Sequence, residues 1–200
     1  KLLKKWATDV WDVGIKFGTI GGKKDGVTYE ITTYRADSYA SDSRKPDVNF
    51  GNSITEDLLR RDFTVNAMAI ELTTPTPEFI DPHNGVTDLL KKTLRTPSSP
   101  ELSFSDDPLR MLRAARFAAQ LGFTIDEGVL SAMQDMADRL AIISAERIRD
   151  EFSKIVMSDN PRVGITILVD TGLCEKFLPE IPKLRLEIDE HHHHKDVYEH

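Results

Sequence analysis

Two arginines and an aspartate, Arg60, Arg61 and Asp62, stand directly before the apolar run 63–70, and Asn66 lies four residues after the aspartate. Guanidinium groups bind phosphate oxygens through two parallel N–H donors. An adjacent carboxylate accepts hydrogen bonds from sugar hydroxyls, and a side-chain amide both donates and accepts. These four side chains therefore predict a site that holds the phosphates and ribose of a nucleotide.

A second interpretation of the same residues needs no ligand. Arg60 and Arg61 would lie at a solvated helix end and pair with Glu56 and Asp57. Exposed ion pairs of this kind are common and contribute little to stability. The residues alone leave both interpretations open.

The segment before these residues has the pattern of β-structure. Residues 11–20 and 26–35 are rich in Val, Ile, Thr and aromatic residues, and the Gly/Lys-rich stretch GGKKDG between them favours an antiparallel hairpin. Residues 35–53 contain many turn formers and no apolar period, which predicts a long, mobile surface loop. Ser53 and Glu56 have the spacing of a capping box and predict a short helix.

After the double arginine, the strand pattern resumes at 63–72 and returns at 78–82. From about residue 84 the pattern becomes helical. Ser105 as cap, the acidic pair that follows it and Pro108 in the first turn predict a helix that ends at Gly122. Further helices are predicted at 84–94, 126–140, 144–157 and 160–172. The fold class is therefore α+β, with a sheet followed by an all-helical part.

Composition and charge exclude some classes of protein. A net charge of −7 argues against a general nucleic-acid coat but leaves room for a local basic groove. No apolar run approaches the roughly 20 residues that span a bilayer. The single cysteine, Cys174, excludes an internal disulfide and fits a small core residue in a reducing compartment. We predict a cytoplasmic protein without membrane association, and the sequence does not indicate an oligomeric state.

The stretch RRDFTVNAMA at 60–69 closely resembles the signature of the class II tRNA nucleotidyltransferases, which include CCA-adding enzymes and bacterial poly(A) polymerases. Further segments resemble that family in the same order: FGTI with YEITTYR, FIDPHNGVTDLLKKTLRT, DDPLRMLRAARFAAQLGF and ISAERIRDEFSKI. The resemblance implies a partial nucleotidyltransferase head of the polymerase-β type, followed by a helical neck and body. It also implies an enzyme that adds CCA to tRNA 3′ ends from CTP and ATP without a nucleic-acid template.

The resemblance divides the chain into four parts. Residues 1–85 would be the partial head, 86–157 the neck with a nucleotide-selecting helix, 158–190 the start of a tRNA-binding body, and 191–200 the beginning of a truncated HD-type domain. The last stretch, HHHHKDVYEH, resembles the opening of HD-type metal phosphohydrolases. His200 would be its first metal ligand, and we expect this incomplete site to hold no metal.

The resemblance also implies roles for individual residues. The arginines, Asp62 and Asn66 would hold the ribose and triphosphate, while Asp107 and Arg110 would select the base and Glu146 and Arg147 would support them. A carboxylate beside a guanidinium matches adenine and cytosine, which present an amino donor next to a ring-nitrogen acceptor, and mismatches guanine and uracil. We expect both selecting residues on the solvent-facing side of one helix. The alternatives are a capping aspartate, a surface arginine and ordinary helix ion pairs.

One part of the family pattern has no counterpart before residue 11. Family members begin with a Gly-rich motif and an Asp-x-Asp strand whose carboxylates hold two Mg²⁺ ions for phosphoryl transfer. We expect those catalytic residues upstream of Lys1, leave them unassigned and expect the 200-residue chain alone to be inactive. Glu30 is the one carboxylate here that we consider for that metal site, and an exposed strand glutamate is an equally good interpretation.

Three other functions stay open. A poly(A) polymerase of the same family would share every motif, although the HD-like ending favours CCA addition. An RNA-binding helical module would have no nucleotide site, and a titration with ATP or CTP would distinguish it. An HD phosphohydrolase would use this chain only as its first part.

Overall fold

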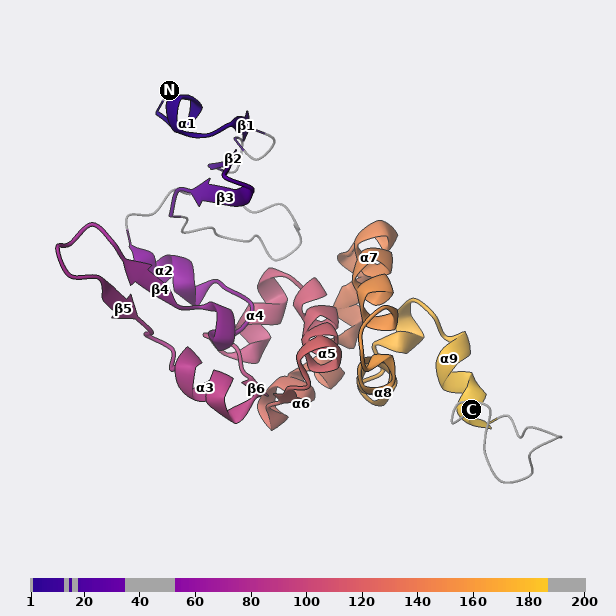
Figure 1. The fold of residues 1–200 in the computed structure, drawn as a ribbon. Coiled ribbons are helices and arrows are strands. Elements are labelled where there is room, and N and C mark those ends of the chain that lie inside the picture. Colours follow the sequence, from indigo (N-terminus) through magenta and orange to yellow (C-terminus); the bar gives the residue numbers. More distant parts are fainter. Residues whose placement is uncertain (1, 13–14, 16–17, 35–52, 187–200) are drawn as a thin grey trace. The chain divides into compact units, whose positions relative to one another are not determined.

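The computed structural model describes residues 2–12, 15, 18–34 and 53–186 (Figure 1). The chain forms two compact units, Lys1–Arg60 and Arg61–His200. Most of the surface loop predicted at 35–53, and the His200 site, lie outside the described residues.

The first unit contains a three-stranded antiparallel sheet in the order β1-β2-β3. Its elements are α1 (Leu3–Trp6), β1 (Asp9–Trp11), β2 (Thr19–Lys24), β3 (Val27–Thr32) and α2 (Ile54–Leu59). The predicted hairpin is confirmed as β2–β3, and its turn residues Asp25 and Gly26 have φ of 51° and 82°, as a type I′ turn requires. The predicted helix after Ser53 is confirmed as α2, because the Ser53 side chain accepts a hydrogen bond from the Glu56 backbone.

The single strand predicted at 11–20 is wrong, because among its described residues only Trp11, Thr19 and Ile20 are in strands, at the end of β1 and the start of β2. Residues 21–24 belong to β2 rather than to the turn. Gly21 pairs with Trp11 across the sheet, and a Cβ atom on Gly21 would lie 2.0 Å from Nε1 of that tryptophan. The glycine therefore makes room for the indole ring over the strand.

The first part of the second unit contains one antiparallel strand pair. Its first elements are η2 (Thr64–Asn66), β4 (Ala69–Glu71), β5 (Glu78–Ile80), α3 (Gly85–Lys91) and β6 (Thr93–Leu94). Strands β4 and β5 pair antiparallel, which confirms that the chain returns after 72, but the strand predicted from residue 63 starts only at Ala69. A short 3-10 turn precedes it, in which the Phe63 N–H donates to the Asn66 side chain.

The rest of the second unit is helical. Its elements are α4 (Pro100–Asp106), α5 (Leu109–Leu121), β7 (Thr124–Ile125), α6 (Glu127–Asp135), η3 (Ala137–Ile142), α7 (Ala145–Val156), α8 (Pro161–Asp170), η4 (Cys174–Lys176), α9 (Glu180–Lys183) and η5 (Leu184–Leu186). Strand β7 pairs in parallel with β6. The sheet comes first in the chain and most of the helices follow it, which agrees with the predicted α+β class.

The single helix predicted from Ser105 to Gly122 is wrong in its first turn. Helix α4 ends at Asp106, and Asp107 has an extended backbone with φ −145° and ψ 99°. Pro108 has no N–H to continue the earlier helix, so a new helix, α5, begins at Leu109. The predicted helix at 126–140 is also two elements, α6 and η3.

The core of the second unit surrounds α5. The buried side chains of this helix include Met111, Leu112, Ala115 and Ala119. Gly164 of α8 lies so close that a Cβ atom there would be 3.1 Å from the Ala119 Cβ. The absence of a side chain thus permits the two helices to pack closely.

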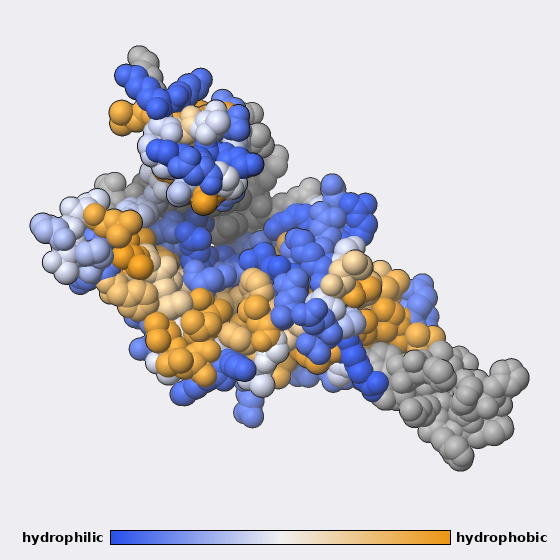
Figure 2. All heavy atoms as spheres, in the orientation of Figure 1, coloured by the Kyte–Doolittle hydropathy of each residue, from blue (hydrophilic) through white to orange (hydrophobic). Residues whose placement is uncertain are grey.

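Two further features complete this unit. Cys174 is fully buried, and burial raises the pKa of its thiol to about 11, which confirms that it is a core residue. An apolar surface covers the β4–β5 hairpin and α3 (Figure 2), where Ile70, Leu72, Phe79 and Leu90 are all more than half exposed.

Candidate functional site

Asp62 makes polar contacts through both of its carboxylate oxygens. Its Oδ1 accepts hydrogen bonds from the Asn66 side-chain amide at 2.7 Å and from the Phe63 N–H at 3.1 Å. Its Oδ2 accepts from Nε of Arg113 at 2.7 Å and also pairs with Nη2 of that arginine. The side chain is buried.

These contacts bear on the ribose-binding role predicted for Asp62 and Asn66. A carboxylate has about four acceptor positions, and the four donors around Asp62 occupy them. The Asn66 carbonyl also accepts from the Phe63 N–H, at 3.3 Å. In the described structure the two side chains therefore hold the turn at 62–66 in shape, and their contact with a ribose stays a prediction.

The two arginines differ in their surroundings. Arg60 ends the first unit, and its Nε lies 3.5 Å from Oδ1 of Asp57. The partner is the one that the helix-end interpretation names, but the pair is not solvated, because the two side chains are only 17% and 5% exposed. Arg61 begins the second unit and is exposed. The phosphate-binding role predicted for both stays a prediction.

Asp107 occupies the break between α4 and α5. Its Oδ1 accepts a hydrogen bond from the Leu109 N–H at 3.1 Å, which caps α5, and its Oδ2 accepts from Nη2 of Arg147 at 2.9 Å. Arg147 comes from α7, as a supporting role would require, while Glu146 beside it is exposed. The Asp107 side chain keeps 26% of its surface exposed, so a ligand can still reach it.

The predicted solvent-facing position of Arg110 is wrong. Only 8% of this residue is exposed, and its Nη1 donates to the backbone oxygen of Ser103 at 3.2 Å and to its hydroxyl at 2.9 Å. The reason is the helix break, which turns α4 back over the first turn of α5. Beside it, burial raises the pKa of the Asp106 carboxyl, and the charge of Arg110 opposes that rise.

The sequence reasoning missed two arginines on α5. Arg113 holds Asp62, and Arg116 forms an ion pair with the buried Glu151 of α7, with 2.7 Å between Nε and Oε2. Both guanidinium groups lie over the ring of Phe117, at 5.3 Å and 4.4 Å from its centroid. Burial lowers the pKa of the Arg116 guanidinium, and Glu151 opposes that change. In the sequence, both arginines follow Arg110 at three-residue intervals, and this spacing could have indicated that they share its face of the helix.

The turn at 62–66 is also fixed from the other side. Thr64 Oγ1 donates to Oδ2 of Asp88 on α3 at 2.6 Å, and the same oxygen accepts from Nε and Nη2 of Arg95 at 3.1 Å and 2.8 Å. Asp81 accepts from the first N–H groups of α3. The segment 81–95 therefore forms one bonded connection between the turn and the helices.

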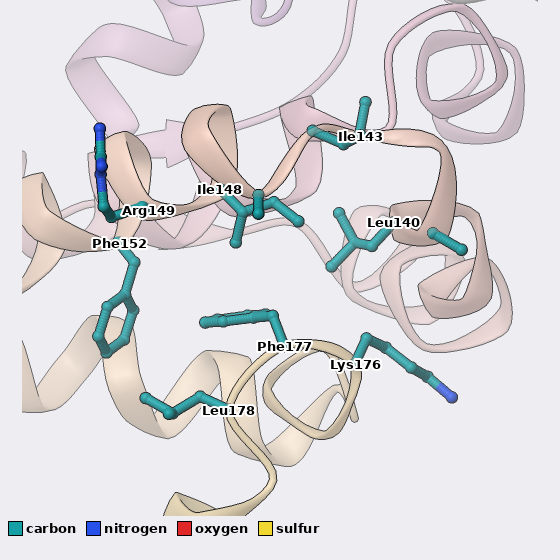
Figure 3. A pocket seen from close by; sticks show the side chains of 10 residues that line it. Leu140, Ile143, Ile148, Arg149, Phe152, Lys176, Phe177 and Leu178 are labelled. Carbon is teal, nitrogen blue, oxygen red and sulfur yellow. The ribbon is translucent and has the colours of Figure 1, made fainter.

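A pocket of about 440 Å³ lies between η3, α7 and residues 176–178, at the end of η4 and just after it (Figure 3). It is lined mainly by apolar side chains, among them Leu140, Ile148, Phe152 and Phe177, with Arg149 and Lys176 also contributing. None of the predicted site residues lines it, so it is separate from the candidate nucleotide site.

Known families match most of the chain. Residues 1–95 match the poly A polymerase head domain, and residues 122–184 match the probable RNA and SrmB-binding site of polymerase A. The chain is 42% identical over 175 residues to the CCA-adding enzyme of Lactobacillus johnsonii, covering 87% of this chain and 42% of the relative. This chain belongs to the class II tRNA nucleotidyltransferase and poly(A) polymerase family.

Other members of this nucleotidyltransferase family give the same result. The CCA-adding enzyme of Enterococcus faecalis is 41% identical over 171 residues, which are 85% of this chain and 41% of that enzyme. A solved structure of the Bacillus stearothermophilus CCA-adding enzyme in complex with CTP matches with a TM-score of 0.75 and 34% identity, covering 90% of this chain and 44% of that chain. The chain thus spans about two fifths of the length of the curated relatives it matches.

The family assignment and the predicted order of head and helical region are confirmed. The division into 1–85, 86–157, 158–190 and 191–200 stays a prediction. The head match reaches residue 95, whereas the compact units separate between Arg60 and Arg61.

Two other expectations from the sequence concern a metal site and a membrane-spanning helix. Glu30 lies on β3 opposite Gly21 and is exposed. Within the described residues, no three His, Cys, Asp or Glu side chains are grouped so that they could hold a metal ion. Among the same residues, no helix combines the length and the apolar character needed to cross a membrane.

Proposed function

We propose that this chain supplies the nucleotide-binding and base-selecting part of a template-independent RNA nucleotidyltransferase that adds CCA to tRNA 3′ ends from CTP and ATP. The observation that carries the proposal is the start of α5. There Asp107, supported by Arg147, lies three residues before Arg110, which Ser103 holds, and Arg110 lies one helical turn before the arginine that binds Asp62. The curated relatives are CCA-adding enzymes, which supports the same activity.

Base selection follows from the hydrogen-bonding capacity of the pair. In this proposal the Asp107 carboxylate accepts from the amino group of cytosine or adenine, and the Arg110 guanidinium donates to the ring nitrogen beside it. Uracil and guanine would place an N–H donor against the guanidinium and a carbonyl oxygen against the carboxylate. A site of this kind rejects the wrong base strongly, because the mismatch leaves buried polar groups without partners.

The remaining substrate contacts belong to other parts of the chain. Arg60 and Arg61 would bind the triphosphate, and the helices in 122–184 would contact tRNA, since that segment matches a probable RNA-binding region. Mg²⁺ would supply charge stabilisation for phosphoryl transfer, as divalent metal does in nucleotidyltransferases of this family. Glu30 alone is not a binding site for that ion, so no ligand set is assigned among the described residues.

Nucleotide binding by the 200-residue chain tests the base-selecting site. Isothermal titration with CTP, ATP, UTP and GTP should show tighter binding of the first two. Asp107→Ala should remove most of that preference, and Arg61→Ala should weaken all four nucleotides alike because phosphates carry no base identity. Asp150→Ala is the matched control, since this carboxylate is 55% exposed and pairs only with its neighbour Arg149 in the described contacts. Equal affinity of the unaltered chain for all four nucleotides would refute the assignment.

A chimera tests the activity itself. The chain would replace the matching segment of the Lactobacillus johnsonii enzyme, and the product would be assayed on tRNA that ends before CCA. Addition of two cytidines and one adenosine, followed by a stop, is the expected result. Continued addition of adenosine would instead identify the chain as a poly(A) polymerase segment, the second candidate, which the match to a poly A polymerase head keeps in view.

A further inference from the structure

We infer that Arg113 is a positioning residue that fixes the turn at 62–66 to the base-selecting helix, so that Arg61, which directly precedes this turn, and Arg110 hold one relative position within the second unit. The inference rests on the proposed function, which it deepens. Arg113 is not assigned a contact with substrate.

The first support is the geometry of the Arg113–Asp62 pair. Nε and Nη2 of Arg113 both bind Oδ2 of Asp62, which is 51 residues away in sequence. Asp62 uses its other oxygen to hold Asn66 and the Phe63 N–H. Removal of Arg113 would therefore leave a buried carboxylate with half of its partners missing, and the turn would lose its polar contact with α5 and keep only the packing of Phe63 on Phe117.

The second support is the position of Arg113 along α5. It comes three residues after Arg110, so the two arginines lie on one face and are separated by about 4.5 Å along the helix axis. Arg61 precedes Asp62 directly in the chain. One turn of helix thus connects the predicted base-selecting arginine to the turn that carries a predicted phosphate-binding arginine.

The third support is the set of side chains that pack against Arg113. Its guanidinium lies over the Phe117 ring, and that ring also packs edge to face on Phe63, with 5.5 Å between the centroids. Arg116, which the buried Glu151 of α7 holds, also lies over the Phe117 ring. The position of Arg113 is therefore set by three elements, the turn, α5 and α7.

A misplacement of about 1 Å between binding groups can cost about 100-fold in function. We therefore expect Arg113→Gln to weaken the binding of CTP and also to reduce the ratio of CTP to UTP affinity by about tenfold or more, although Asp107 and Arg110 are unchanged. A residue that served stability alone would lower the melting temperature and leave that ratio as it was.

The experiment compares the unaltered chain, Arg113→Gln, Arg113→Lys and Arg185→Gln by titration with CTP and UTP. Arg185→Gln is the control, because it removes an Arg–Asp contact of 2.8 Å to Asp170, outside the candidate site. Arg113→Lys keeps the charge but not the two-point contact, so it should fall between the unaltered chain and Arg113→Gln. It also replaces Arg113→Gln if that variant fails to fold.

A second readout needs no nucleotide. Hydrogen exchange of the Phe63 amide, which donates to Asp62 and Asn66, should be faster in Arg113→Gln and unchanged in Arg185→Gln. Unchanged exchange together with an unchanged CTP to UTP ratio would overturn the inference. A lack of CTP preference in the unaltered chain would instead overturn the proposed function, and the exchange result would still decide whether Arg113 holds the turn.

Discussion

Gly164→Ala should destabilise the chain even though alanine is the better helix former. A Cβ atom at this position of α8 would lie 2.5 Å from Cγ2 of Ile155, whereas ordinary contacts begin at 3.4 Å. Ile155 is fully buried, so relief of the overlap requires a helix to move by almost 1 Å in a packed core. Overpacking of this kind costs about 1–3 kcal/mol, and the higher helix propensity of alanine offsets about 1 kcal/mol.

The net loss for Gly164→Ala is therefore about 1 kcal/mol, or a fall of about 3 °C in Tm for a chain of this size. Urea unfolding followed by circular dichroism measures it. Gly128→Ala in α6 is the control, because this glycine is exposed and its added Cβ would approach only Oδ1 of Asp126, at 3.2 Å. Gly164→Ala together with Ile155→Leu should recover part of the loss. A rise in stability for Gly164→Ala alone would show that α8 does not pack as closely as described.

Three other outcomes follow from buried groups. Glu151→Gln leaves Arg116 without its charged partner and should lower the free energy of unfolding by about 3 kcal/mol. Urea unfolding measures this change, and a decrease no larger than the ~1 kcal/mol of an exposed ion pair would contradict the prediction. Because burial raises the pKa of the Cys174 thiol to about 11, iodoacetamide at pH 8 should label it only as fast as the chain unfolds, and faster labelling would show an open site. Burial raises the pKa of Asp106 above its ordinary 3.8, so the folded state binds the proton more tightly and stability falls as the pH rises above that value. Asp106→Asn should remove this pH dependence in Tm, and an unchanged profile would argue against the burial effect.

Local patterns predicted the elements that depend on local chemistry. The β2–β3 hairpin follows from turn residues that tolerate positive φ, and α7 follows from the apolar spacing of Ile148 and Ile155. The break before α5 did not follow from the sequence, because Pro108 fits both the first turn of one helix and the junction between two. The burial of Arg110 depends on that break and so could not be predicted either.

The candidate site was predictable in its residue types and less so in its contacts. The motif around Asp62 identified the family, and Arg147 reaches Asp107 from the neighbouring helix. The bond from Arg113 to Asp62 spans 51 residues, and no pattern within a single element indicates which acid an arginine will meet. The three-residue spacing of the arginines on α5 indicated that they share one face of the helix, but it did not indicate which acidic residues they contact.

The parallel pairing of β6 with β7 has a consequence for how this part of the chain folds and opens. The Thr124 N–H donates to Lys92 and the Asp126 N–H to Leu94, at 2.8 Å and 3.1 Å, which closes α4 and α5 into one loop. The entropy cost of closing a loop is met once and grows only slowly with its length. We therefore expect residues 92–126 to open as one cooperative unit. The hydrogen-exchange rates of the Thr124 and Asp126 amides should then report how often α5, the base-selecting helix, detaches from its native packing.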